Sequence, residues 1–299
     1  MITSGEAERA ARAVLERACR SVGVSAEGAE LLRLGENAIY RLPEGIVARV
    51  TRPGQQHAAR REVLVARWLE ANGVSAVRAA PGLRQPVEVD GRSVTWWREL
   101  PPHRYGDTLD VAAMLRRLHH LPPPSTFSLG RLDPFVRLAE RIDRASTLAE
   151  ADRAWMRGHL ARLRARHAEL PAGLPSAVVH GDAWVGNVLR TQDGRTVLLD
   201  LERCSVGPPE WDLVSTAVKA YTVAGITDAD YQAFTVAYGH DVVRWGGFET
   251  LRDIREFRMT CMAAQVAAEN PARHPEAALR LACLRGELGD RPWRWTAVP

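Results

Sequence analysis

The stretch that decides the fold is VVHGDAWVGNVLRTQDGRTVLLD, residues 178–200. Its apolar start ends on His180-Gly181-Asp182, and Asn187 follows five positions after the aspartate. An aspartate after a glycine is common in ordinary turns, so the triplet alone indicates little. The residues that follow it decide whether it belongs to a functional site.

The second half of this stretch predicts a β-hairpin. Asp193-Gly194 is a preferred two-residue turn, and with these residues as the loop Asn187 lies directly opposite Asp200. The Cβ atoms of directly opposite residues are about 4.5–5.5 Å apart. Carboxylate and carboxamide oxygens at that spacing can bind Mg²⁺ together. The sequence therefore predicts a magnesium site at Asn187 and Asp200, with Asp182 near the same end of the hairpin.

Phosphoryl transfer needs such a set of groups, namely a base for the acceptor hydroxyl and metal ligands that hold Mg²⁺ against the phosphates. The pattern HGDxxxxN, with a further aspartate thirteen positions after the asparagine, resembles the aminoglycoside-phosphotransferase and choline-kinase-like enzymes. The resemblance covers roughly residues 30–220. It implies that Asp182 is the catalytic aspartate, that Asn187 and Asp200 bind Mg²⁺, and that ATP or GTP is the phosphoryl donor. It also implies that His180 shapes the loop and that Asp212, in GPPEWDLV, braces it.

The N-terminal third of the sequence has the pattern of an antiparallel sheet. The apolar segments AELLRLGEN, AIYRL and GIVARV are typical of strands, and Pro43-Glu44-Gly45 separates the last two. Residues 57–72 predict a helix that ends at Gly73. Asp90-Gly91 lies between PVEV and RSVTWW, which is a strong hairpin signal. Residues 29–97 are therefore expected to form an antiparallel sheet with one inserted helix.

From about residue 108 the apolar periodicity becomes helical. Helices are predicted over 108–121, 132–146 and 149–170, with several more from 211 onward. We therefore expect an α+β chain. With the resemblance, this becomes a bilobal protein-kinase-like fold with a β-rich nucleotide-binding lobe (1–97), a hinge (98–102) and a larger, mainly helical lobe (103–299) that binds the acceptor.

The resemblance also places nucleotide-binding residues in the small lobe. Arg49, in IVARV, occupies the position of the family's phosphate-binding Lys or Arg, and Glu62 of the following helix would pair with it. The helix pattern supports this pairing, because Glu62 falls among apolar core positions and needs a cationic partner there. The segment WWRELPP matches the hinge that binds adenine through its backbone, which adds Arg98, Glu99 and Leu100. The glycine-rich loop is reduced, and Gly35 and Asn37 are its candidates for presenting N–H groups to phosphate.

Composition excludes several classes of protein. The chain has 299 residues, a net charge of +4 and no Lys/Arg run of the kind that binds nucleic acid. Of its 40 basic residues 39 are Arg, and Lys219 is the one Lys. The four scattered cysteines predict neither disulfides nor a zinc site. The start of the chain predicts an amphipathic helix, and no apolar run is long enough for a membrane span. We expect a cytoplasmic monomer or homodimer without a nucleic-acid or membrane partner.

The main hypothesis is a small-molecule kinase that uses ATP and Mg²⁺ on a hydroxyl of an aminoglycoside-type or other antibiotic. The alternative acceptors are a sugar, an amino sugar such as a fructosamine, or an amino alcohol. A nucleotide-binding pseudokinase is disfavoured because Asp182, Asn187 and Asp200 are all present. Trp184 and Glu202 are candidates for acceptor binding. Residues 201–299 contain 13 acidic and 11 basic residues, which is no acidic cluster for a polycation.

Overall fold

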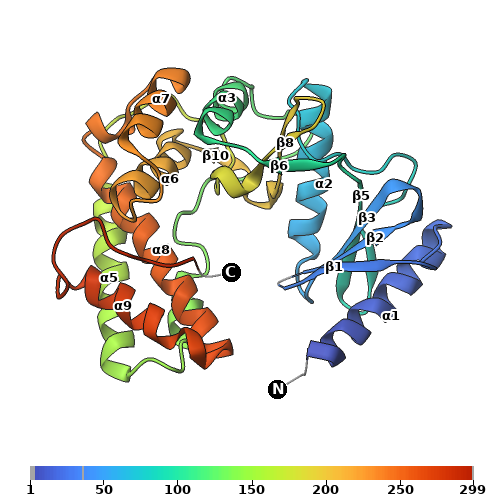
Figure 1. Cartoon of the computed structure of the whole chain (residues 1–299), viewed down its shortest axis with the longest axis horizontal. Helices are drawn as coiled ribbons and strands as arrows, with labels where there is room; N and C mark the ends of the chain where they lie inside the picture. The colour runs from blue at the N-terminus through green and yellow to red at the C-terminus, as the bar shows by residue number, and fades with distance from the viewer. Residues whose placement is uncertain (1–3, 36, 298–299) are drawn as a thin grey trace. The chain divides into compact units, whose positions relative to one another are not determined.

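The computed structural model describes residues 4–35 and 37–297 (Figure 1). The chain forms two compact units. The first unit consists of Met1–Asp110, Leu121–Leu129 and Val185–Cys204, and the second consists of Val111–His120, Gly130–Trp184 and Ser205–Pro299. The segment that opened the sequence analysis is thus divided, because Asp182 belongs to the second unit while Asn187 and Asp200 belong to the first.

The frame of the first unit is a five-stranded antiparallel sheet with the order β1-β2-β3-β5-β4. Its strands are β1 (Glu30–Leu34), β2 (Ala38–Leu42), β3 (Ile46–Val50), β4 (Val87–Val89) and β5 (Arg92–Arg98). Val89 pairs with Arg92 across the two-residue turn Asp90-Gly91, in which both residues have positive φ. The predicted antiparallel sheet and its Asp-Gly hairpin are confirmed.

The two faces of this sheet differ in chemistry. On one face, apolar side chains of β2, β3 and β5, among them Tyr40 and Trp96, pack against α1 (Ser4–Val22). Figure 1 shows this helix lying along the sheet. Because side chains alternate along a strand, Val47, Arg49 and Trp97 point to the other face. The cavity described below lies on that second face.

Helix α2 (Gln56–Ala71) packs against β5. Its buried positions are apolar except for Glu62, which is 4% exposed. The helix ends as predicted, because Gly73 takes a left-handed φ of 70° and the Val74 N–H donates to the Leu69 carbonyl over 2.9 Å. The predicted helix and its glycine stop are therefore confirmed.

The hairpin of β8 (Val188–Thr191) and β9 (Thr196–Leu198) forms, with β6 (His103–Tyr105), a small sheet in the first unit. The predicted register is wrong by one residue, because Val188 pairs with Leu198. The loop contains three residues, 192–194, and the Thr191 N–H donates to the Arg195 carbonyl over 2.9 Å. Gly194 takes a φ of 81°, as in a three-residue loop with a glycine bulge. Asn187 is consequently opposite Leu199 rather than Asp200.

The second unit is mainly helical, as expected. Besides most of α3 (Thr108–His119), it contains α4 (Leu138–Arg144), α5 (Glu150–Ala168), α6 (Glu210–Tyr221), α7 (Asp228–Tyr238), α8 (Phe248–Glu269) and α9 (His274–Leu284). Helix α8 packs against α4, α5, α6 and α9. Two short paired strands, β7 (Ala177–Val179) and β10 (Ser205–Gly207), lie on either side of residues 180–204 in the sequence.

One predicted helix is shorter than expected. The pattern favoured a helix over 132–146, but α4 begins only at Leu138. Arg137 has a φ of 62°, which a helix cannot include, and Pro134 lacks the N–H for a helical hydrogen bond. In this irregular segment Pro134 is buried, Leu132 and Phe135 are half-buried and Val136 is exposed, so its apolar residues gave a helical pattern without forming a helix.

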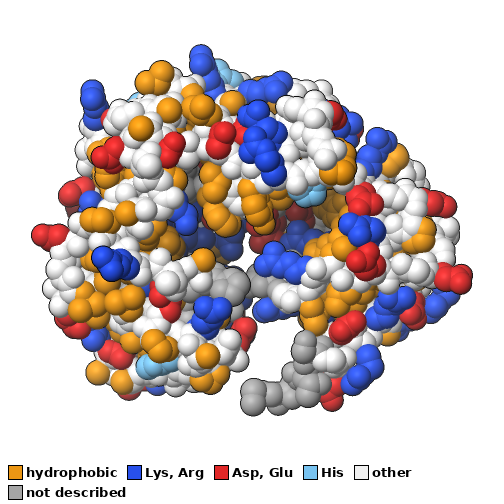
Figure 2. Space-filling model, viewed as in Figure 1, with side chains coloured by type: hydrophobic (Ala, Val, Ile, Leu, Met, Phe, Trp, Pro, Cys, Tyr) orange, Lys and Arg blue, Asp and Glu red, His pale blue; other side chains and the backbone are white. Residues whose placement is uncertain are grey.

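Figure 2 shows basic and acidic side chains interspersed over the face in view, with neither sign alone covering it. Within residues 4–35 and 37–297, no helix combines the length and the apolar character that a membrane crossing needs.

Candidate active site

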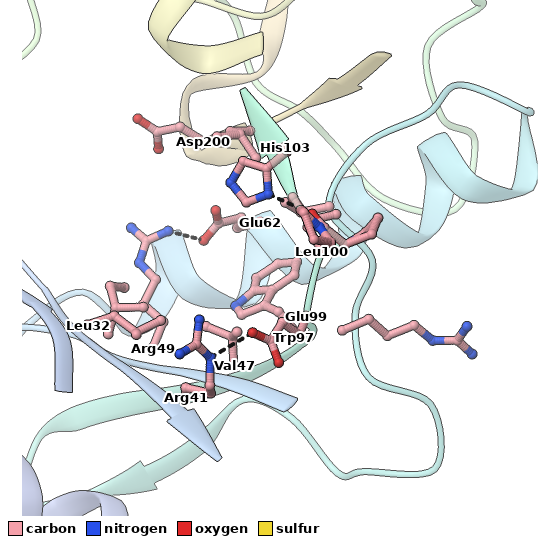
Figure 3. A pocket seen from close by; sticks show the side chains of 16 residues that line it. Leu32, Arg41, Val47, Arg49, Glu62, Trp97, Glu99, Leu100, His103 and Asp200 are labelled. Atoms are coloured by element: carbon pink, nitrogen blue, oxygen red, sulfur yellow. Dashed lines mark hydrogen bonds and ion pairs between the residues drawn. The ribbon is translucent and has the colours of Figure 1, made fainter. Parts of the chain in front are cut away.

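A cavity of about 660 Å³ lies in the first unit, on the face of the sheet opposite α1 (Figure 3). Its walls include the apolar side chains of Ile39, Val47, Val77 and Trp97. Charged groups complete it: Arg41, Arg49, Glu62, Arg98, Glu99 and Asp200. An apolar cavity with a few convergent polar groups is the usual form of a small-ligand site.

Arg49 and Glu62 meet in this cavity, and Figure 3 shows them directed toward each other. Arg49 Nη1 donates to Glu62 Oε2 over 2.6 Å, and Arg49 Nη2 donates to Glu202 Oε2 over 2.8 Å. Burial raises the pKa of Glu62 to about 7, although Arg49 opposes this shift. Burial alone would lower the pKa of Arg49, but Glu62 and Glu202 raise it on balance, so Arg49 stays charged.

Glu202 therefore lies on the Arg49 side chain within the first unit. The sequence predicted an acceptor-binding role for Glu202, whereas in the structure its carboxylate pairs with Arg49, which lines the cavity. Arg61 of α2 also donates to the Glu202 carbonyl. The 153 positions between Arg49 and Glu202 leave no local sequence signal for this contact.

The predicted hinge residues Arg98, Glu99 and Leu100 line the same cavity. The Arg98 N–H donates to the Arg78 carbonyl over 2.9 Å, and the Glu99 N–H donates to the Gly45 carbonyl over 2.7 Å. Pro101 and Pro102 have no N–H. Among the described residues 98–102, Leu100 is thus the one whose N–H has no backbone acceptor, so it can donate to a ligand. The Glu99 carboxylate pairs with Arg41 Nε over 2.7 Å.

Asp200 lines the cavity from just beyond the end of β9. Its backbone has a φ of 54°, which is uncommon for a non-glycine residue and frequent at functional sites. Asn187 ends the short helix η2 (Val185–Asn187), and its carbonyl accepts the Leu199 N–H over 2.9 Å. The two predicted metal ligands thus come from adjacent segments of one unit, although they are not cross-strand partners.

This pair of oxygen donors fits a magnesium ion. The described residues contain no group of three or more His, Cys, Asp or Glu side chains suited to a metal. Mg²⁺ usually has one or two carboxylate ligands from the protein and completes its shell with water and phosphate oxygens. One carboxylate and one carboxamide therefore suit an ion that arrives with a nucleotide.

The reduced glycine loop has one of its predicted donors already engaged. The Gly35 N–H donates to the Asn37 carbonyl over 3.1 Å, which closes the turn between β1 and β2. Glu36, between them, lies outside the described residues. The side chain of Arg49 is therefore a better candidate for binding phosphate than the N–H of Gly35.

In the second unit, Asp212 at the start of α6 holds the loop His180-Gly181-Asp182. Its carboxylate accepts the His180 N–H over 2.7 Å and the Gly181 N–H over 2.9 Å. Burial alone would raise the pKa of the Asp212 carboxyl, but hydrogen bonds from His119 and the His180 backbone lower it on balance. Asp212 is thus a buried anion that fixes the loop carrying Asp182.

A hydrogen-bonded chain continues behind Asp212. His119 Nε2 lies 3.0 Å from Asp212 Oδ2, and His119 Nδ1 lies 2.7 Å from the Tyr238 hydroxyl. The neighbouring His120 is exposed and contacts the Arg116 carbonyl. The two histidines therefore do not form a shared site, and His119 supports the loop from α3. The separation of 93 positions hides this contact from sequence reasoning.

Asp182 has a cationic neighbour that the sequence did not reveal. Arg255 of α8 is 7% exposed, and its Nη1 lies 3.1 Å from Asp182 Oδ1. Its Nη2 donates to the Trp211 carbonyl over 3.1 Å, and its guanidinium lies 4.5 Å from the Trp211 ring centroid. Arg255 is thus rigidly held, and it orients the Asp182 carboxylate.

Comparison with known proteins identifies a family for the chain. A family model described as the phosphotransferase enzyme family, APH, matches residues 32–257. No curated protein matches the chain. Among solved structures, the choline kinase LicA from Streptococcus pneumoniae is similar at 16% identity, with a TM-score of 0.62 over 91% of this chain and 98% of that one.

Two further solved structures, of a kinase and a phosphotransferase, are similar at comparable levels. The amicoumacin kinase hAmiN, solved with AMP-PNP, Ca²⁺ and its ligand, has 14% identity and a TM-score of 0.68 over 94% of each chain. The aminoglycoside phosphotransferase APH(3'')-Id from Streptomyces rimosus has 20% identity and a TM-score of 0.57 over 83% of this chain and 97% of that one. These likenesses confirm the predicted kinase-like α+β fold. With the family model covering most of its length, the chain belongs to the phosphotransferase enzyme family and is a small-molecule kinase.

Proposed function

We propose that this enzyme transfers the terminal phosphoryl group of ATP, or of GTP, to a hydroxyl group of a small molecule in a Mg²⁺-dependent reaction. The observation that carries the proposal is the cavity of the first unit, where the buried Arg49–Glu62 pair and Asp200 line one site. An apolar cavity suits a nucleobase, and a guanidinium with a carboxylate suits phosphates with their metal ion.

Within that cavity each residue has a defined task. The Leu100 N–H donates to the base, and Trp97 offers it an aromatic wall. Arg49 binds phosphate oxygens through its planar guanidinium, whose forked donors suit phosphate. Asn187 and Asp200 would hold Mg²⁺, which neutralises charge on the phosphates when bound.

Asp182 is the proposed base. It accepts a hydrogen bond from the acceptor hydroxyl and takes its proton as the phosphoryl group is transferred. Arg255 donates to Asp182 Oδ1 over 3.1 Å and so orients the carboxylate toward its task. Asp212, itself held by His119, keeps the loop backbone in place.

For the acceptor, we propose an antibiotic, with a sugar, amino sugar or amino alcohol as alternatives. Solved structures of similar fold include kinases named for choline, amicoumacin and aminoglycosides. A pseudokinase scaffold is disfavoured because Asp182, Asn187 and Asp200 are all present.

Calorimetric titration of nucleotide with and without Mg²⁺ tests the first-unit site. Asp200→Ala should abolish the Mg²⁺-dependent gain in ATP affinity, whereas Asp193→Ala, in the loop of the same hairpin, should retain it. Asn187→Ala should have a smaller effect, because a neutral ligand is lost. An unchanged magnesium requirement in Asp200→Ala would remove Asp200 from the site.

A further inference from the structure

Lys219 is the single lysine of the sequence, and it lies in the second unit near the loop that carries Asp182. Its Nζ is 5.5 Å from the centroid of the Trp184 ring, and Trp184 follows Asp182 by two residues. The Trp184 side chain is 41% exposed, so a ligand can reach this pair. A cation beside an aromatic ring is attracted to it, which fixes the position of the ammonium group.

Among the described residues, no acidic side chain pairs with the ammonium group of Lys219. Within the described part of the chain it has no hydrogen bond and no ion pair, and the Trp184 ring is its recorded contact. Burial lowers the pKa of Lys219, and Arg280 lowers it further. A partly buried cation without an anionic partner is disfavoured unless a ligand supplies the anion.

Several carboxylates of α6, α8 and the Asp182 loop are engaged in hydrogen bonds or ion pairs of their own. Glu210 Oε1 accepts the Leu174 N–H, while its buried Oε2 has no hydrogen-bond partner among the described residues, and Asp212 accepts the two loop N–H groups. Glu256 is paired with Arg291 and Thr222, and Asp253 with Arg166 and Arg252. Asp182 itself is held by Arg255. At Lys219 the charge that remains for a ligand is therefore cationic, whereas a polycationic acceptor needs available carboxylates.

We propose that Lys219 and Trp184 form an anion-binding subsite of the second unit, which takes a carboxylate or phosphate group. The substrate class follows from the proposed function, on which this step depends: the acceptor is a hydroxyl compound that carries an anionic group. The phosphates of the nucleotide present the same chemistry, so the test below separates the two sources.

The unique lysine permits a direct test. Pyridoxal 5′-phosphate and pyridoxal both form an imine with an unprotonated amine by loss of water, and borohydride reduces the imine to a stable amine. The two reagents differ in the phosphate. Labelling of Lys219 is measured by peptide mass spectrometry, on the folded protein and on the same protein in urea.

We expect the ratio of Lys219 labelling by pyridoxal 5′-phosphate to labelling by pyridoxal to be at least tenfold higher in the folded protein than in urea. Inorganic phosphate should suppress labelling by pyridoxal 5′-phosphate in the folded protein. An equal ratio in both states, absence of labelling in the folded protein, or indifference to inorganic phosphate would overturn the subsite.

Protection experiments then identify the source of the anion. Glycerate and glycerol 3-phosphate are compared with glycerol, choline and magnesium AMP-PNP as protecting agents. Protection by the anionic hydroxyl compounds supports an anionic acceptor. Protection by AMP-PNP alone, or by choline, overturns it.

Kinetics separate this inference from the proposed function. With an acceptor that is turned over, Lys219→Met should raise its KM at least tenfold, leave the KM for ATP unchanged, and be partly rescued by Lys219→Arg. Turnover of cationic acceptors alone, unaffected by Lys219→Met, would overturn the inference and leave the kinase function standing. Selective labelling of Lys219 in a protein that does not bind magnesium nucleotide would support the anion subsite and overturn the proposed kinase function.

Discussion

Removing Arg49 should destabilise the first unit by an amount that grows with pH. Glu62 is 4% exposed, and burial raises its pKa to about 7 while Arg49 is present. Without Arg49 the favourable charge interaction is lost, so the pKa of Glu62 must rise further. In the unfolded chain the carboxyl ionises near its ordinary value of 4.5.

The direction of the pH dependence of stability follows from this order of pKa values. A carboxyl whose folded pKa is raised favours the folded state below the unfolded pKa, and this stability is lost as pH rises through the folded pKa. In the wild type the loss is nearly complete above about pH 7, whereas in Arg49→Ala it continues upward. Each pH unit above 7 therefore costs the variant up to about 1.4 kcal/mol more than the wild type.

At pH 9 the added difference should reach about 2–3 kcal/mol, on top of a pH-independent loss of packing. Native-state hydrogen exchange of α2 peptides at pH 6, 7.5 and 9, corrected for intrinsic rates, measures the local free energy of opening. Glu62→Gln in the Arg49→Ala background should abolish the dependence, because the titrating group is gone. Parallel pH profiles for wild type and Arg49→Ala would refute the coupling of the two side chains.

Three further predictions test other parts of the site. Leu100→Pro should weaken ATP binding at least tenfold in calorimetry, because the remaining hinge N–H is lost, whereas Leu100→Ala should bind ATP normally. Equal affinities of the two variants would show that the Leu100 N–H does not bind the nucleotide. His119→Ala should lower kcat about tenfold with an unchanged KM for ATP, since Asp212 loses one of its donors, at a cost of about 1–3 kcal/mol; unaltered kcat would limit His119 to packing. Burial, helped by Arg162, lowers the pKa of His159 to about 4, so the stability of the folded protein should fall as pH drops from 6.5 toward 4. In thermal unfolding, His159→Phe should show a smaller fall than the wild type. Identical pH profiles of the two proteins would show that His159 does not cause the loss of stability.

Local patterns were sufficient for some of these features. The Asp90-Gly91 turn has strand-forming segments on both sides, and Glu62 falls at a core position of a helix, so both could be predicted from neighbouring residues. Asp193-Gly194 is compatible with a two-residue and a three-residue loop, and the structure has the longer one. A shift of one residue changes every cross-strand partner, so Asn187 could not be placed against Asp200 from the turn signal.

The remaining contacts join distant parts of the sequence. Arg255 is 73 positions from Asp182, and Glu202 is 153 positions from Arg49. No periodicity or turn signal connects residues so far apart, because the contact exists only after the helices have packed. The orientation of Asp200 depends on its left-handed backbone conformation, which cannot be predicted for an aspartate from the sequence.

Phosphoryl transfer by the Asp182→Asn variant is the most direct test of the central claim. The amide matches the carboxylate in shape, so folding and calorimetric ATP binding should be retained. Transfer from γ-³²P-labelled ATP is measured over a panel of anionic, neutral and cationic hydroxyl compounds. Wild-type enzyme should label at least one acceptor in a Mg²⁺-dependent manner, and the variant should label it at least a hundredfold more slowly, within the range that a lost general base produces. Equal rates for the two proteins would contradict the assignment of Asp182 as the base.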